Sequence, residues 1–133
     1  MYKKLIEDII NKYEYIIVSK SIEFFEATQH EGFVRGSLLF IDGTIHYLFK
    51  YVAIINKKVT KLKYRYHYET ENGNLIFRYD NAPHHKEIKT FPHHKHTIDG
   101  ITASKEPDLA SVLDEIANQV ISVQELLDNS KEW

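Results

Sequence analysis

The chain has 133 residues, the length of one compact domain, so a single domain over residues 1–133 is expected. Apolar residues make up 43% and charged residues 27% of it, and cysteine is absent, which excludes disordered classes, disulfide scaffolds, thiolate nucleophiles and cysteine-ligated zinc. The net charge of −2 with neutral histidines gives no overall attraction to nucleic acid, so any anion binding has to be local.

The chain begins with a short amphipathic helix expected over residues 2–13, where apolar residues recur between charged ones. From residue 16 to 79, β-branched and aromatic residues are separated by turn signals, which predicts five strands. These strands are expected near 19–29, 33–41, 44–55, 59–70 and 74–80. Their short loops favour an antiparallel meander. The longest apolar run, residues 51–55, is far shorter than the ~20 residues of a membrane span, so we expect a cytoplasmic protein without a membrane partner.

Asn72-Gly73 is the strongest short hairpin signal in the chain, because a type I′ turn needs positive φ at both central positions. A two-residue loop there places Tyr68 opposite Phe77 on an aromatic face. The other face is ionisable, and it pairs Arg65 with Asp80 and His67 with Arg78.

Asp42-Gly43 predicts a second hairpin by the same logic. A two-residue loop there pairs Phe40 with Ile45 on the face toward the core. His46 then lies on the opposite face, where we expect it to be exposed or paired and not catalytic.

The segment from residue 81 to 105 holds two of the three prolines and has no clear periodicity, so it is expected to be a long, functional loop. A second helix is expected over residues 108–129, with apolar residues spaced four and three apart. This apolar stripe either covers the inner face of the sheet or forms a seam with a partner protein or in a homodimer. The fold class is therefore α+β: a five-stranded, mostly antiparallel sheet (meander) flanked by N-terminal and C-terminal helices.

Five of the eight histidines fall within thirteen residues of this loop, beside three lysines and one acid. Imidazole takes or gives a proton near neutral pH, because its unperturbed pKa is ~6.5, so paired histidines can act as general base and general acid. RNA cleavage uses such a set without a metal. One imidazole removes the 2′-hydroxyl proton, a second protonates the departing 5′-oxygen, and a cation stabilises the phosphoryl oxygens.

The residues that could perform this chemistry are the candidate catalytic residues, and we expect the reaction to need no cofactor. They are His84, His85, His93, His94, His96, Lys95, Arg78 and Asp80. One proton-transfer group is expected at position 94 or 96 and the other at position 84 or 85. Lys95 and Arg78 are expected on the phosphate, and Asp80 is expected to orient an imidazole.

Metal binding is the competing chemistry of the same loop. The alternative ligands for zinc, manganese or iron are His84, His94, His96 and Asp80. No His-Glu-x-x-His or comparable helical pattern is present, so the spacing does not identify a metal. A loop that only docks RNA, the ribosome or a protein partner is the third interpretation.

Several stretches of the sequence resemble the TumE family, the toxins of a class of type II toxin–antitoxin pairs. Residues 75–85, followed by residues 90–96, resemble the histidine-rich signature of that family. Residues 35–44 resemble its Arg-Gly, Asp-Gly-Ser/Thr hairpin, and residues 64–68 resemble its aromatic strand. The resemblance covers about residues 32–116.

The resemblance implies a small cytoplasmic toxin that inhibits growth, with RNA as the expected target class. It also implies a cognate antitoxin, usually a helix-turn-helix protein, that neutralises the toxin by direct contact. Two positions depart from the family pattern, since Lys50 stands where an acidic residue is expected and Tyr79 where tryptophan is frequent. The sequence thus predicts a metal-independent endoribonuclease, with a non-enzymatic binding module and a metal-dependent phosphodiesterase as alternatives.

Overall fold

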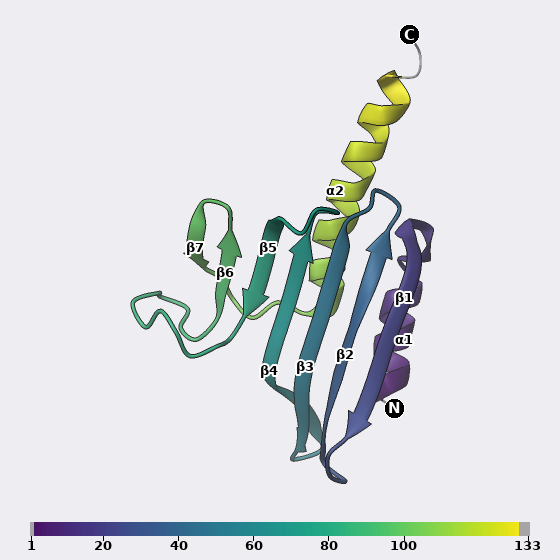
Figure 1. Ribbon diagram of the computed structural model, residues 1–133. Helices are drawn as coiled ribbons and strands as arrows, with labels where there is room; N and C mark the ends of the chain where they lie inside the picture. Colours follow the sequence, from purple (N-terminus) through teal and green to yellow (C-terminus); the bar gives the residue numbers. More distant parts are fainter. Residues whose placement is uncertain (1, 131–133) are drawn as a thin grey trace.

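The structure is a computed structural model that describes residues 2–130, so the expected domain limits at residues 1 and 133 lie outside it. Residues 2–130 form two α-helices and one antiparallel sheet whose seven strands neighbour each other in chain order (Figure 1). The elements are α1 (Tyr2–Asn11), the 3-10 helix η1 (Glu14–Ile16), β1 (Ile17–Glu26), β2 (Glu31–Phe40), β3 (Ile45–Ile55), β4 (Lys58–Glu69), β5 (Leu75–Asp80), β6 (His94–Thr97), β7 (Gly100–Ala103) and α2 (Leu109–Ser130). The α+β class is confirmed, but the sheet has seven strands and not five.

The two faces of the sheet differ, because side chains along a strand point alternately to either side. Both helices lie behind the sheet in Figure 1 and cover one face, which forms the hydrophobic core. Three tyrosines spaced two apart in β4, Tyr64, Tyr66 and Tyr68, are fully buried there together with Ile6 of α1 and Leu113 of α2. No helix of residues 2–130 covers the other face, which we call the open face.

Helix α2 covers the sheet with its N-terminal half. It begins after Asp108, whose Oδ1 accepts a hydrogen bond of 2.8 Å from the backbone N–H of Ser111 and so caps the first turn. Its apolar stripe is buried from Leu109 to Val120, which confirms that this half packs on the sheet, and the rest of the helix extends beyond the ends of the strands (Figure 1). Neither helix of the described residues has a stretch long and apolar enough to cross a bilayer.

The hairpin between β4 and β5 confirms the predicted faces. Its loop is one residue longer than predicted, because Thr70 and Asn74 pair across it and Gly73 takes a positive φ of 85°. A register shift after Tyr68 compensates for the extra residue, so Tyr68 still pairs with Phe77. The ionisable residues of both strands therefore share the open face.

The hairpin between β2 and β3 contradicts the prediction for His46. Its loop also has three residues, with Gly43 at a φ of 87°, and here no shift compensates for the extra residue. His46 pairs with Leu38 as a result, and its side chain points into the core with no exposed surface. A one-residue change of register moves every side chain of a strand to the other face, so the expected position of His46 away from the core was wrong.

The long loop expected over residues 81–105 is interrupted by the hairpin of β6 and β7. Hydrophobic periodicity misses β6, because its side chains alternate between ion pairs on the two faces of the sheet. His94 faces the carboxylate of Asp80 on the open face, whereas Lys95 binds Glu115 of α2 on the covered face. The true loop is therefore only residues 81–93, and it brings the two histidine groups together.

Candidate functional site

A cleft of about 460 Å³ lies on the open face, where β5 ends and β6 begins. It is lined by Phe49, Lys63, Tyr64, Arg65, Arg78, Asp80, Ala82, His84, His85, His94 and His96. Six of the eight side chains nominated from the sequence therefore line a single cleft.

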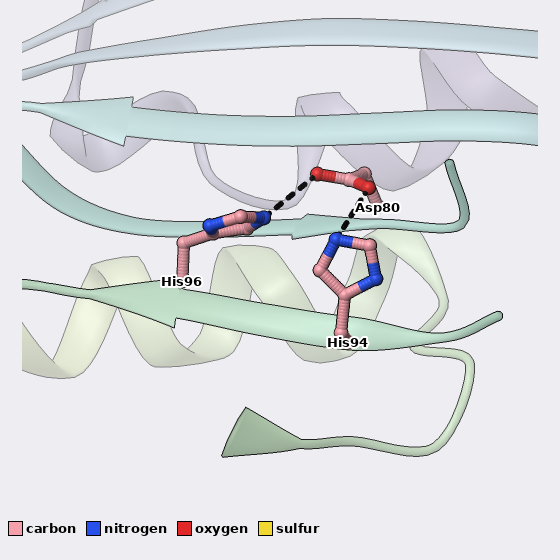
Figure 2. A group of neighbouring side chains, drawn as sticks. All are labelled: Asp80, His94 and His96. Carbon is pink, nitrogen blue, oxygen red and sulfur yellow. Dashed lines mark ion pairs between the residues drawn. The ribbon is translucent and has the colours of Figure 1, made fainter. Parts of the chain in front are cut away.

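Strand pairing explains why these side chains meet. In the antiparallel pair of β5 and β6, Asp80 lies opposite His94 and Arg78 lies opposite His96. Residues two apart in a strand point to the same face, so all four side chains lie next to one another on the open face. Figure 2 shows the two imidazoles of β6 turned toward the carboxylate at the end of β5.

His94 holds this carboxylate in place. Its Nε2 lies 2.8 Å from Oδ1 of Asp80, and its Nδ1 lies 2.9 Å from the backbone oxygen of Pro92. The ring is almost completely buried, and both of its nitrogens have a protein partner. His94 therefore has no nitrogen left for a substrate, and its position suits an orienting role.

His96 is the imidazole that is available for proton transfer. Its Nε2 lies 3.4 Å from Oδ2 of Asp80, while its Nδ1 has no hydrogen-bond partner among residues 2–130. Burial lowers the pKa of His96, and the nearby guanidinium of Arg78 lowers it further, which favours the neutral ring at pH 7. A neutral imidazole held at one nitrogen by a carboxylate is the arrangement of a general base.

The loop of residues 81–93 brings a third imidazole to the cleft. The ring centroid of His85 lies 6.2 Å from that of His96 and 5.6 Å from that of His94. His85 has a positive φ of 59°, a backbone conformation that is uncommon outside glycine and is frequently found at functional sites. Its Nδ1 lies 3.4 Å from the exposed carboxylate of Glu87. His84 lines the outer part of the cleft and is exposed, so His85 is the better placed of the two.

Arg78 supplies positive charge on the same side. Its Nε lies 3.5 Å from Oδ2 of Asp80, and this buried nitrogen has no hydrogen-bond partner within the described part of the chain. The guanidinium thus has donors that a bound anion can use.

Two nominated residues do not line the cleft. Lys95 points to the covered face, where its Nζ lies 3.0 Å from Oε2 of Glu115, and this position does not fit the expected contact with a phosphate. His93 stacks on Tyr64, with ring centroids 5.8 Å apart, and its Nδ1 is 2.9 Å from the hydroxyl of Tyr64. Strand alternation separates Lys95 from its histidine neighbours, which the sequence did not reveal because it showed no strand there.

Lys50, which departs from the family pattern, also lies away from the cleft. It is buried on the covered face, with its Nζ 5.4 Å from the ring centre of Tyr66 and with no ion pair among the described residues. Burial lowers the pKa of Lys50 to about 7. The presence of lysine at position 50, where the family pattern has an acidic residue, therefore does not alter the set of residues that line the cleft.

Five lining residues were not nominated from the sequence: Phe49, Lys63, Tyr64, Arg65 and Ala82. Arg65 could have been, because the predicted pairing of β4 with β5 already places it on the ionisable face. Phe49 and Lys63 depend on the register between β3 and β4, which is set by their tight turn and by a register shift between Tyr51 and Val52. Asn56 and Lys57 form that turn at φ values of 52° and 65° without a glycine, so the sequence gives no clear signal.

The cleft also has a candidate metal-binding group. One ligand atom from each of Asp80, His94 and His96 lies within 4.8 Å of the others. Two imidazoles and one carboxylate suit zinc, manganese or iron. His84, the fourth nominated ligand, is not part of this group. A bound ion would have to replace the contacts between the two imidazoles and the carboxylate.

Comparison with known proteins gives one match. The family model described as Toxin TumE matches residues 3–124. No curated protein and no solved structure matches the chain. The matched region contains all seven strands and the buried half of α2, and so it includes every residue of the cleft.

Proposed function

This chain belongs to the TumE toxin family, and we propose that it acts as a metal-independent endoribonuclease that uses histidine acid–base chemistry. One observation carries the proposal: a neutral imidazole, His96, is held by a carboxylate while a second imidazole, His85, lies 6.2 Å away in the same cleft. Two imidazoles on either side of one phosphate are what transfer of a phosphoryl group between two ribose oxygens requires.

In this mechanism His96 is the general base. Its Nε2 keeps its hydrogen and points it toward Oδ2 of Asp80, and its Nδ1 removes the proton of a ribose 2′-hydroxyl. The 2′-oxygen then forms a bond to phosphorus, and the bond from phosphorus to the 5′-oxygen of the next nucleotide breaks. His85, in its protonated form, gives a proton to that departing oxygen. The products are a 2′,3′-cyclic phosphate and a 5′-hydroxyl end.

The remaining groups of the cleft support this reaction. Arg78 and Arg65 are placed to stabilise the negative charge that develops on the phosphoryl oxygens. His94 acts through Asp80, because its contact with Oδ1 keeps Oδ2 turned toward His96. The need for a 2′-hydroxyl makes RNA the substrate and excludes DNA.

Cleavage of RNA by the purified chain in excess EDTA tests this function. We expect cleavage to persist, to yield 2′,3′-cyclic ends, and to stop at a nucleotide that carries 2′-deoxyribose. The His96→Ala variant should lower the rate by ~10²–10⁴, the usual contribution of one general base. His30→Ala, which changes an exposed histidine in the turn between β1 and β2, is the matched control and should cleave normally. Binding of RNA without cleavage would leave only a non-enzymatic binding module.

A metal-dependent phosphodiesterase is the second candidate function, favoured by the convergence of Asp80, His94 and His96. In that case EDTA should abolish cleavage, and zinc or manganese should restore it. This outcome would contradict the metal-independent mechanism and reassign the imidazoles as ligands.

Because the chain belongs to a toxin family, it is also expected to bind a protein partner. We propose that a cognate antitoxin of the helix-turn-helix class neutralises the chain by direct contact. Expression of the chain alone should arrest growth, and co-expression of the small reading frame beside its gene should restore growth and yield a complex on purification. Unimpaired growth on expression of the chain alone would contradict the toxin pairing.

A further inference from the structure

Three phenylalanines form a row on the open face of the sheet, beside the cleft. We propose that this row is a binding track for single-stranded RNA, in which bases stack on Phe33 and Phe49 while Lys63, Arg65 and Arg35 contact the backbone. The proposal rests on the proposed function for its substrate class. It assigns a second part of the binding site, outside the catalytic residues.

The row is continuous and leads into the cleft. Phe25 of β1 stacks on Phe33 of β2, with ring centroids 4.6 Å apart and an interplanar angle of 19°. The centroid of Phe33 lies 6.0 Å from that of Phe49 in β3, and Phe49 itself lines the cleft. A strand of RNA bound at the catalytic histidines can therefore extend onto these rings without leaving the sheet.

The hydrophobic core does not account for these rings. The core lies on the covered face, and strand alternation places the three phenylalanines on the face that no helix of residues 2–130 covers. Phe25 is 39% exposed, and the other two are partly exposed. Aromatic rings presented to solvent next to cations are typical of proteins that bind single-stranded nucleic acid.

The charge along the row suits a polyanion. Lys63 lies over the ring of Phe49 at 6.0 Å, and Arg35 lies over the ring of Phe25 at 5.2 Å. Arg35 pairs with Glu23 at 3.3 Å, but neither Lys63 nor Arg65 has an ion-pair partner among the described residues. These two cations lie between the phenylalanines and the histidines, where the backbone of a bound strand would pass.

The acids of this face are already engaged. The hydroxyl of Tyr51 donates a hydrogen bond to Glu31, and Glu69 lies 2.9 Å from His67. Glu23, Glu31 and Glu69 thus each have a partner, whereas Lys63 and Arg65 have no acidic partner among the described residues. These two cations place positive charge beside the row although the whole chain has a net charge of −2.

The register gives the direction of the track. A single cross-strand row runs through Arg35, Phe49, Arg65, Asp80 and His94, from β2 to β6. Strands β2 and β6 are separated by four inter-strand spacings, which is ~19 Å at the usual separation of neighbouring strands. An extended strand of a few nucleotides covers this distance. The bases must be unstacked from any partner to lie on the rings, so the track should reject duplex RNA.

Fluorescence anisotropy with a labelled ten-nucleotide RNA tests the track. The RNA carries 2′-O-methyl groups throughout, so it cannot be cleaved and its binding is measured separately from chemistry. Phe33→Ala and Phe49→Ala should each weaken binding about tenfold, since stacking of one base on an aromatic side chain contributes ~1–3 kcal/mol. Lys63→Ala should reduce the dependence of affinity on salt.

Matched variants separate stacking from loss of the fold. Phe33→Trp keeps an aromatic face and should bind as well as the wild type, whereas Phe33→Leu keeps an apolar side chain without a π-face and should bind about as weakly as Phe33→Ala. Tyr15→Ala changes an aromatic side chain that is 61% exposed outside the sheet, and it should leave binding unchanged. Circular dichroism of each variant confirms that the sheet is intact.

The length of the RNA provides a second measurement. The wild type should bind the ten-nucleotide RNA much more tightly than a dinucleotide, and Phe33→Ala should lose most of this gain. Equal affinity of wild type and Phe33→Leu for the ten-nucleotide RNA would overturn the track, and so would equal affinity for single-stranded and duplex RNA. Tight binding through Phe33 without any cleavage would instead overturn the endoribonuclease and leave the track intact.

Discussion

The two faces of the sheet hold the same kinds of ionisable side chain in opposite circumstances. On the open face, His94 and His96 share the carboxylate of Asp80. On the covered face, His46 and Lys50 are buried and form no ion pair with any acid of residues 2–130, and burial lowers their pKa values to about 4 and about 7. A carboxylate gives the imidazoles of the open face a partner, whereas burial of the groups on the covered face disfavours their charged forms.

The largest expected effect comes from removing that carboxylate. Asp80→Asn keeps the shape of the side chain but takes away the charge that orients His96 and fixes the hydrogen on its Nε2. Single-turnover cleavage of RNA should slow by ~10³, within the range for loss of an oriented base. His30→Ala serves again as the control. A rate for Asp80→Asn no lower than that of the control would show that the cluster on the open face is not catalytic.

On the covered face, replacing Lys50 should stabilise the protein. Its pKa falls from the ordinary 10.5 to about 7 because of burial, so the unfolded chain binds more protons than the folded chain between these values. The free energy of unfolding should therefore rise with pH, by ~2 kcal/mol between pH 7 and 9. Lys50→Met should be more stable than the wild type at pH 7 and should lose this rise.

Urea unfolding at the two pH values measures both effects of Lys50. Lys12→Met, which removes an exposed lysine after α1, is the matched control and should keep the pH profile of the wild type. If Lys50→Met and the wild type gain stability equally between pH 7 and 9, the lysine is solvated in the folded protein and the contrast between the faces is weaker than the structure indicates.

The same contrast explains what could be predicted from the sequence. The aromatic and ionisable faces of β4 and β5 were predicted correctly, because the register shift after Tyr68 compensates for the extra loop residue. The convergence of histidines from both ends of the loop was predicted from their clustering in the sequence, although which of them has a free nitrogen was not. Which nitrogen is free depends on the contacts of His94 with Pro92 and Asp80. These contacts link a loop to the end of a strand, so no local sequence pattern predicts them.

Two other features could not be predicted for physical reasons. Strand β6 has no apolar alternation, because ion pairs hold His94 and Lys95 to opposite faces, and β7 pairs only with β6. The position of His46 depends on whether a loop has two or three residues, and the same Asp-Gly pair is compatible with either. A sequence pattern thus predicts faces well only where hydrophobic burial, and not a polar contact or a single turn, determines the register.

A smaller effect is expected when the pH is lowered past the pKa values of His46. Burial lowers its pKa, a hydrogen bond to the backbone oxygen of His67 opposes this in part, and the value is about 4 against the ordinary 6.5. The unfolded chain therefore binds the proton first as pH falls, and the folded state loses ~1–2 kcal/mol between pH 7 and 5 through this group. His46→Gln, which keeps a neutral hydrogen-bonding side chain, should lose less stability over this range in thermal unfolding. Identical pH profiles would mean that His46 is not buried as a neutral ring.

The smallest effect is expected at Lys95, which lies between two histidines of the site in sequence but on the other face of the sheet. Its ion pair with Glu115 is partly exposed, and such pairs contribute less than ~1 kcal/mol, so Lys95→Met should lower the free energy of unfolding only slightly. RNA cleavage should be unchanged, because the ammonium group does not reach the cleft. A loss of cleavage as large as that of Asp80→Asn, with the fold intact, would show that the two faces are functionally connected. Unchanged cleavage would show instead that strand alternation limits the site to one face, even between adjacent residues.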